Sequence, residues 1–572
     1  MRRVAICALL CGFAAAQAPC AQRAAKPAAS PDPVRYRIGG VIVDATTETP
    51  IVGAELSITT AEVEMRVTSD EEGHFVFEGL EAGKYAVTAS APGYVTESYN
   101  EHRGYSTAIA VGEGLDSEHM LFRLHRQAVI TGTVTDERGE AVRNAQVLLF
   151  VEERAAGKQS VRMAGTKQTD DLGVYRFAHL RAGKYFVAVS ARPWYAQTGI
   201  RDWAEPEPDT VEGGSLAAVS RLVPLKTDAQ LDVVYPATLY PGVTDEHSAG
   251  ELVLNPGDTQ EADVRLHAVP SIHMRVTNLP PEQPRQPSIY FGATQKVFSF
   301  GGSGVPVTTG QVAPGVYEVA GLPPGDVTLT LHDNRSGQHE MRTIHANATD
   351  GESIDARGTG ATASVSGKVL GTDVAGAKMQ GQVALAGKRG QEYSSRLEKD
   401  GTFSFPAVDA DTYEVEVHMG ADEYVREVSA TGAKASAEEV TIEGTDEVQL
   451  VIRMARGHGE VKGVVKVHDK PQAGAMVLLV PASGTVSGEA LERHARMDQS
   501  DSDGTFTLAR IFPGKYVLMA IEDGWDLDWR DPEVLRPYRE KGQPVEIAAG
   551  DVKKLTVEQQ KHQELQNSEA KN

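Results

Sequence analysis

Cysteine is nearly absent from this chain of 572 residues, and its three cysteines all lie within the first twenty positions. Cys7 and Cys11 fall in a segment that we expect to be removed, so no internal disulfide is expected in the mature chain. Units of about 90 residues can be held by ordinary hydrophobic cores without such cross-links. Cys20 follows Gln17-Ala18-Pro19, a poor match to lipoprotein signals, so lipid anchoring at Cys20 is not expected.

Long apolar runs are also lacking, except at the N-terminus. Residues 4–16 are apolar and follow two arginines, which is typical of an export signal. An A-x-A cleavage site ends at Ala16 or, alternatively, at Ala18, so residues 1–18 are predicted to be a signal peptide and residues 19–33 a flexible linker. No later stretch is long enough to span a bilayer. The mature chain is therefore predicted to be extracytoplasmic, either periplasmic or secreted, and not membrane-spanning.

Positive charge is scarce relative to negative charge. The chain has 56 lysines and arginines against 79 aspartates and glutamates, which gives a net charge of −23 at pH 7. Nucleic acids and anionic membranes are bound through an excess of lysine and arginine, so both are excluded as expected partners. The acidic balance instead indicates solubility of an exported protein.

Catalytic and metal-binding motifs are missing as well. None of the 16 histidines has a glutamate three residues later, and neither an H-E-x-x-H helix motif nor a G-x-S-x-G turn occurs. Asp498, Asp501 and Asp503 resemble part of a calcium loop, but Ala509 stands where its closing glutamate is required, and turn chemistry explains these acids better. We therefore predict no enzyme activity, no cofactor and no metal site.

What the chain does contain is a short motif in five copies. Counted from Gly73, apolar residues stand at +2, +4 and +7, a glycine at +10 and a tyrosine at +12. The clear copies are 70–85, 171–185 and 503–516, and weaker ones begin at Gly315 and Gly401. The spacing predicts a turn, a strand with one apolar face, a second turn and a strand that starts with tyrosine. Phe75, Phe77 and Tyr85, with their counterparts Tyr175, Phe177 and Tyr185, are predicted to be buried.

Similar strand patterns open and close each unit, as in Ile38–Asp44 and Ile130–Asp136, with almost no helical periodicity between them. The predicted fold class is all-β, a tandem array of about five small antiparallel β-sandwiches of transthyretin-like or immunoglobulin-like type. The expected β-sandwiches span 34–126, 127–267 with a long insertion, 268–362 with a divergent sequence, 363–456 and 457–558, followed by a polar tail at 559–572.

The order I-x-G-x-V-x-D, then G-A-x-V, then D-x-x-G-x-F-x-F-x-x-L-x-x-G-K-Y resembles the carboxypeptidase regulatory-like domain. This family has a transthyretin-like sandwich and belongs to a broader group of carbohydrate-binding-like folds. Two stretches, 235–242 and 529–535, also look like multi-copy exported proteins of soil bacteria. The resemblance implies an exported bacterial repeat protein. Because the zinc motif and the peptidase domain that accompany such domains are missing, it implies a fold and not a chemistry.

Tryptophan is rare, and its four residues follow the Gly-Lys-Tyr strand in units two and five only. Trp194 and Trp525 stand nine residues after the tyrosine, as Tyr94 does in unit one, and such a recurring aromatic indicates a structural plug at the end of the sandwich. Trp203 and Trp529 have no counterpart. They either stack on a sugar ring or pack against a neighbouring unit.

Two hypotheses about function follow. The first is a non-catalytic binding protein for a glycan or another cell-surface polymer, in which flat aromatics and nearby carboxylates hold a sugar and several weak modules act together. The alternative is a structural spacer or envelope scaffold that binds envelope proteins; an accessory role in a metallocarboxypeptidase system is a remote third. The ligand-binding residues of the first hypothesis are Trp525, Asp526, Asp528, Trp529 and Tyr538 in unit five and Trp194, Tyr195 and Trp203 in unit two. This role requires a partly accessible Trp529, whereas its burial favours the scaffold.

Overall fold

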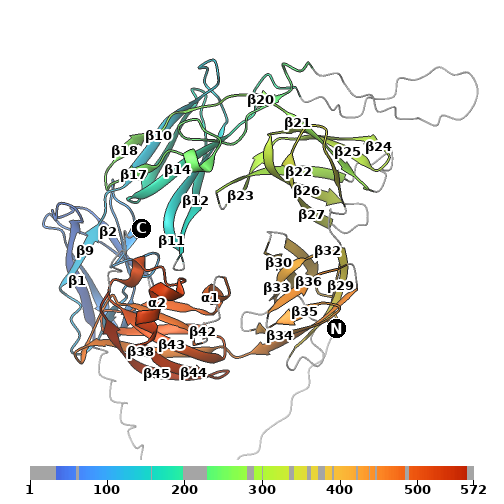
Figure 1. The fold of residues 1–572 in the computed structure, drawn as a ribbon. Helices are drawn as coiled ribbons and strands as arrows, with labels where there is room; N and C mark the ends of the chain where they lie inside the picture. Colours follow the sequence, from blue (N-terminus) through green and yellow to red (C-terminus); the bar gives the residue numbers. More distant parts are fainter. Residues whose placement is uncertain are drawn as a thin grey trace, which may run out of the picture.

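The computed structural model describes residues 34–562 apart from short internal stretches. These gaps are 60–63, 156–157, 198–227, 280–288, 299, 334–339, 357–361, 372–380, 389–391, 420–422, 437, 445–446 and 483–488. The expected signal peptide and linker, Trp203 and most of the polar tail lie outside the described residues. Figure 1 shows five groups of strands that follow one another around a ring, with the fifth group beside the first.

The first unit shows the arrangement that the other units repeat. Its opening strand β1 (Tyr36–Asp44) pairs antiparallel with β4 (His74–Leu80) and parallel with β9 (Met120–Leu124). A second sheet has the order β3-β2-β6-β7, and β5 pairs with β8. The remaining strands are β2 (Glu55–Thr59), β3 (Glu64–Thr68), β5 (Gly83–Tyr85), β6 (Val87–Ser90), β7 (Glu97–Ser98) and β8 (Ile109–Val111).

The second unit has two sheets, β13-β10-β18 and β12-β11-β14-β16. Its elements are β10 (Ala128–Thr135), β11 (Gln146–Ala155), β12 (Lys158–Gln168), β13 (Val174–Leu180), β14 (Gly183–Ser190), β16 (Thr238–Leu239), η1 (Glu246–Ser248), β17 (Leu252–Leu254), β18 (Thr259–Glu261) and β19 (Val264–Arg265). A two-stranded link of β15 (Val233–Val234) and β20 (Val269–Pro270) leads into the third unit.

The third and fourth units each have two sheets of four or five strands. The third unit contains β21 (Ile272–Thr277), β22 (Ile289–Val297), β23 (Phe300–Val305), β24 (Thr308–Ala313), β25 (Val316–Leu322), β26 (Gly325–Asp333), β27 (Glu340–Ala348) and β28 (Ser353–Asp355). The fourth contains β29 (Thr362–Leu370), β30 (Gln382–Gly387), β31 (Glu392–Arg396), β32 (Thr402–Asp409), β33 (Asp411–His418), β34 (Glu423–Thr431), β35 (Lys434–Ser436), β36 (Glu439–Ile442) and β37 (Val448–Arg456).

The fifth unit adds short helices to the same strands. Its strands are β38 (Gly459–Val467), β39 (Lys470–Pro471), β40 (Met476–Pro481), β41 (Arg496–Gln499), β42 (Thr505–Ile511), β43 (Gly514–Ile521), β44 (Gln543–Ile547) and β45 (Val552–Gln560). Its helices are α1 (Glu489–His494), η2 (Gly524–Asp526) and α2 (Pro532–Arg539). Asp531 caps α2 by accepting a hydrogen bond from the Glu533 amide. No helix in the described part of the chain is long and apolar enough to cross a membrane.

The predicted all-β class is confirmed, with one addition. In every unit the opening strand lies between an antiparallel hairpin strand and a parallel closing strand, so the sheets are not purely antiparallel. The opening, hairpin and closing strands are β10 with β13 and β18, β21 with β25 and β28, β29 with β32 and β37, and β38 with β42 and β45. The sequence shows which segments are strands but not the direction in which the last one pairs.

A β-bulge explains why the repeated motif places apolar residues at +2, +4 and +7. Ile38 lies opposite Phe77 whereas Tyr36 lies opposite Leu80, so β4 carries one extra residue between these pairs. The extra residue reverses the alternation of faces, and therefore the odd position +7 points to the same side as +4. The residue at +6 has a positive φ in four units: Gly79, His179, Gly321 and Arg510.

Each unit has its own hydrophobic core, and the motif supplies its aromatic residues. Five of the six residues predicted to be buried are buried; the exception, Tyr85, is half-buried. The motif tyrosine donates from Oη to the carbonyl four residues earlier, which fixes the second turn and keeps the tyrosine tip at the surface of the core. These pairs are Tyr85 with Glu81, Tyr185 with Arg181, Tyr413 with Asp409 and Tyr516 with Phe512.

A histidine bridges the second and third units. His273 in β21 places Nε2 2.7 Å from Asp232 of the second unit and Nδ1 2.7 Å from Glu318 in β25. Its burial lowers the pKa, but the hydrogen bonds and charges of the two carboxylates outweigh burial, so the pKa of His273 is raised. Arg275 and Asp350 line the same small cavity.

This bridge predicts a pH-dependent junction. A histidine whose pKa is raised by folding stabilises the folded state fully below its unfolded pKa of about 6.5, and this stability is lost as the pH rises through the folded pKa. Wild-type protein should therefore lose more thermal stability between pH 6 and pH 8.5 than the His273→Gln variant, as measured by calorimetry. Equal pH profiles of the two proteins would contradict the bridge.

Candidate functional site at the junction of units one, two and five

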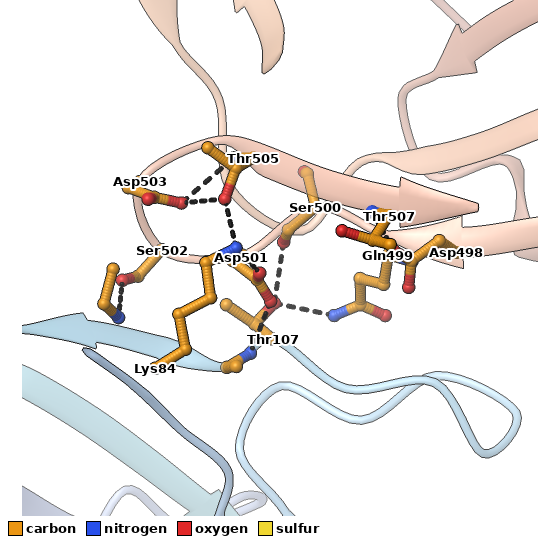
Figure 2. A network of polar contacts seen from close by, with 12 residues as sticks. Lys84, Thr107, Asp498, Gln499, Ser500, Asp501, Ser502, Asp503, Thr505 and Thr507 are labelled. Carbon is orange, nitrogen blue, oxygen red and sulfur yellow. Dashed lines mark hydrogen bonds and ion pairs between the residues drawn. The ribbon is translucent and has the colours of Figure 1, made fainter. Parts of the chain in front are cut away.

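The fifth unit contacts the first across almost the whole length of the sequence. Asp501 binds Lys84 Nζ and accepts a hydrogen bond from the Ala108 amide at 3.0 Å (Figure 2). The Ser502 amide donates to the Ala108 carbonyl at 2.9 Å, and Ser502 Oγ accepts from the Ala110 amide at 2.8 Å. The turn before β42 is thereby joined to the edge of unit one at β8.

Buried polar groups extend this contact. Gln499 Nε2 donates to Thr107 Oγ1 at 2.7 Å and to the Asn100 carbonyl at 2.6 Å. Burial raises the pKa of Asp501, and the hydrogen bond and charge of Lys84 oppose this rise. Asp501 thus has its partners in unit one. Asp503, in contrast, accepts a hydrogen bond from the Thr505 amide in its own turn. Asp498 accepts a hydrogen bond from the Thr507 amide at 2.8 Å, so each of the three acids has a partner within the protein.

Trp525 lies at the contact between units five and one, in a cluster with residues of β40 and β43 of its own unit. Its ring stacks on His102 of unit one with 5.3 Å between centroids and 6° between planes, and Tyr105 stacks at 5.7 Å. Trp525 is buried, with these two rings packed against it. Such stacking between aromatic rings adds to the area they bury and stabilises the contact between the units.

Trp529 and Tyr538 lie in a second apolar cluster of the fifth unit. Trp529 is 4% exposed, so it lacks the accessibility that the glycan hypothesis requires of it, and its burial favours the scaffold. It is buried because η2 and α2 fold back onto β40 and β43, where Leu535 and Met519 belong to the same cluster. The sequence analysis did not predict that these helices cover Trp529, because helices this short give little helical periodicity.

A large cavity lies where units one, two and five meet. Its volume is about 1090 Å³. This volume is at the upper end of the range usual for ligand pockets, or slightly above it. Three of the predicted site residues, Trp525, Asp526 and Trp529, line it, whereas Asp528, Tyr538, Trp194 and Tyr195 do not. The remainder of the wall comes from residues 101–105 of unit one, from the β11–β12 and β13–β14 hairpins of unit two and from residues around α1.

Asp526 ties the three units together. Arg103 of unit one donates to Asp526 Oδ1 at 2.6 Å and to the Arg154 carbonyl of unit two at 2.6 Å, while Arg154 donates to the Asp526 carbonyl. Arg181 of unit two donates to Glu101 of unit one at 2.8 Å. The cavity is thus a composite site that requires all three units to be in place.

Trp194 and Tyr195, the described site residues of unit two, lie elsewhere. Trp194 is 84% exposed, which contradicts the structural plug expected at its offset. The hydroxyl of Tyr195 bonds to Glu137. Burial, and secondly the hydrogen bond to this carboxylate, raise the pKa of Tyr195 to about 12. The structure therefore does not bring Trp194 and Tyr195 together with the unit-five residues, and their ligand role, like that of Asp528, stays a prediction.

Sequence reasoning missed His102, Arg103 and Tyr105, which form the unit-one wall. These residues lie in a loop that the repeated motif does not include, and the only available signal was the density of polar and aromatic residues in 99–105. Nothing in their spacing indicates a partner about 400 residues away. Loops of this kind commonly carry function on a rigid scaffold.

The exposure of Trp194 predicts a small stability effect. The Trp194→Ala variant should unfold within about 0.5 kcal/mol of wild type, because a surface side chain loses little on truncation. Denaturant unfolding followed by circular dichroism measures this difference. A loss above about 2 kcal/mol would show that Trp194 is covered in solution.

Comparison with known proteins confirms the resemblance for the first two units. The model of the carboxypeptidase regulatory-like domain matches residues 37–118 and 129–205. Comparison with curated proteins finds no match to the chain.

Several solved structures are similar to parts of this chain. The TIE protein of Bacillus anthracis is 9% identical over 92% of this chain and 68% of its own, with a TM-score of 0.15. A streptococcal ancillary pilin is 10% identical over 51% of this chain and 99% of its own, with a TM-score of 0.20. GBS52, a minor pilin of Streptococcus agalactiae, is 15% identical over 36% of this chain and 100% of its own, with a TM-score of 0.19. These scores are too low to support any conclusion about arrangement or activity.

Proposed function

We propose that the chain is an exported, non-catalytic binding protein whose five β-sandwiches close into a ring and hold a glycan or envelope polymer at the junction of units one, two and five. The observation that carries this proposal is the composite cavity of about 1090 Å³. Three residues expected to bind a ligand line it, although they come together with loops that the sequence did not indicate. The family model that matches units one and two describes a regulatory-like domain, and a non-catalytic role is consistent with that description.

A structural scaffold that binds envelope proteins is the second candidate. The burial of Trp529 and the stacking of Trp525 on unit one favour it, because these residues stabilise the chain's own architecture. Other junctions are similarly fixed: Phe298 of unit three packs on Phe150 and Phe186 of unit two, with ring centroids 5.1 Å apart in each pair. A role beside a metallocarboxypeptidase is the remote third candidate.

A glycan array with the mature chain separates the first two candidates. Wild-type protein should bind at least one glycan, and the Asp501→Lys variant, in which the contact between units one and five is weakened, should bind it less tightly. Circular dichroism of the variant checks that its sandwiches remain folded. If wild type binds no glycan, or if both proteins bind equally, the cavity is not the binding site and the scaffold is favoured.

A further inference from the structure

The charged side chains of the composite cavity are balanced, unlike those of the chain as a whole. Five arginines line it, Arg103, Arg154, Arg162, Arg181 and Arg496, against five carboxylates, Glu101, Glu152, Glu153, Glu492 and Asp526. The chain as a whole carries a charge of −23. Arginine is therefore concentrated at this site, but without an excess of positive charge.

The arginines already have partners within the protein. Arg162 binds Glu153, Arg103 binds Asp526 and Arg181 binds Glu101. Arg496 donates instead to backbone carbonyls, including that of Arg510 at 2.6 and 2.9 Å. At these three pairs, an anionic ligand competes with the carboxylate for its arginine, and a cationic ligand competes with the arginine for its carboxylate. Either competition leaves one member of the pair without its charge-assisted hydrogen bond.

A ligand hydroxyl avoids this loss because it donates and accepts at once. A carboxylate has about four acceptor positions and a guanidinium has five donors, so each pair keeps unused hydrogen-bonding capacity. Hydroxyls can donate to the carboxylate and accept from the arginine without separating the two. Tyr105, which is half-buried, adds apolar surface to the wall, which suits the carbon faces of a sugar ring.

We propose that the composite cavity binds a neutral oligosaccharide, held by hydroxyl contacts to its arginine–carboxylate pairs. This inference rests on the proposed binding function and specifies its ligand class. The Arg162–Glu153 pair is the clearest contact, because both residues belong to neighbouring strands of unit two and Arg162 is 54% exposed. Arg162 bonds to Glu153 and to the Met163 carbonyl, both in unit two, so it contributes to the cavity without holding the ring closed.

Isothermal titration calorimetry of the full mature chain tests this proposal. The probes are three neutral oligosaccharides, maltohexaose, cellohexaose and hexa-N-acetylchitohexaose, with hexagalacturonate as the anionic and chitosan hexamer as the cationic comparison. At least one neutral probe should bind more tightly than both charged probes. Arg162→Gln should weaken that binding about tenfold, because it removes a charge-assisted hydrogen bond.

Arg66→Gln is the matched control. Arg66 lies on β3, the unit-one counterpart of β12, is 60% exposed and binds Glu55 and Glu64 away from the cavity. This variant should bind the neutral probe as wild type does. Tighter binding of a charged probe, equal binding by the two variants, or no binding of any neutral probe overturns the proposal. If the glycan array finds only a charged ligand that Asp501→Lys binds less tightly, the proposed function stands and the neutral class falls; if the array finds no ligand, both fall.

Discussion

Replacing Phe77 by alanine is expected to lower the free energy of unfolding of unit one by about 3–5 kcal/mol, the usual range for a core aromatic. Phe77 is fully buried, lies opposite Ile38 in the pair of β1 and β4, and contacts the ring of Phe75 edge-on with 6.3 Å between centroids. Truncation leaves a cavity that the close-packed neighbours fill only in part, so both transfer energy and packing are lost.

The neighbouring residue Val76 provides the control. Val76 points to the opposite face of β4 and is 42% exposed, so Val76→Ala should change stability by about 0.5 kcal/mol or less. Hydrogen exchange of the β1 and β4 amides at increasing urea concentration reports the stability of this unit separately. Similar losses for both variants would mean that the assigned register is wrong. Phe177→Ala should behave in unit two as Phe77→Ala does in unit one.

The second large effect is expected from reversing the charge of Asp501. Asp501→Lys places two ammonium groups together and leaves the Ala108 amide without its acceptor. The closing contact should weaken by about 2 kcal/mol, or roughly 30-fold in its equilibrium constant, the lower end for a hydrogen-bonded charge pair because Lys84 remains partly exposed. Small-angle X-ray scattering should show a larger radius of gyration.

Two further variants test the specificity of this effect. Asp70→Lys changes the same turn position in unit one, where the aspartate is exposed, and should leave the radius of gyration unchanged. Adding Lys84→Asp to Asp501→Lys restores opposite charges and should recover part of the closure. If the double variant scatters like the single one, Lys84 and Asp501 do not interact in solution.

The repeated hairpin was predictable because its information is local. The positions of Phe75, Phe77 and Leu80 in one strand specify which face is apolar, and their burial follows. The bulge was already implied by the change from even to odd spacing between +4 and +7, since strict alternation cannot bury both positions. What remained hidden was the parallel pairing of the closing strand, because apolar alternation is the same for both strand directions.

The composite site was only half predictable. Tyr94, Trp194 and Trp525 share one offset from the motif tyrosine, yet they have three different environments. Tyr94 bonds Asp44 within its own unit at 3.0 Å, Trp194 is exposed, and Trp525 stacks on another unit. Spacing within one repeat reports on the interior of that repeat. Contacts between repeats depend on how rigid bodies are placed in space, and that information is not local.

The parallel pairing of opening and closing strands has a mechanical consequence. In unit one, Gly40 lies beside Met120 and Asp44 beside Leu124, so the chain enters at one end of the sandwich and leaves at the other. Pulling on the two ends of such a unit slides β1 along β9 and strains their hydrogen bonds simultaneously, in shear, whereas an antiparallel terminal pair would open one bond at a time. Since all five units share this pairing, a tensile load along the chain meets the same shear geometry at each of them.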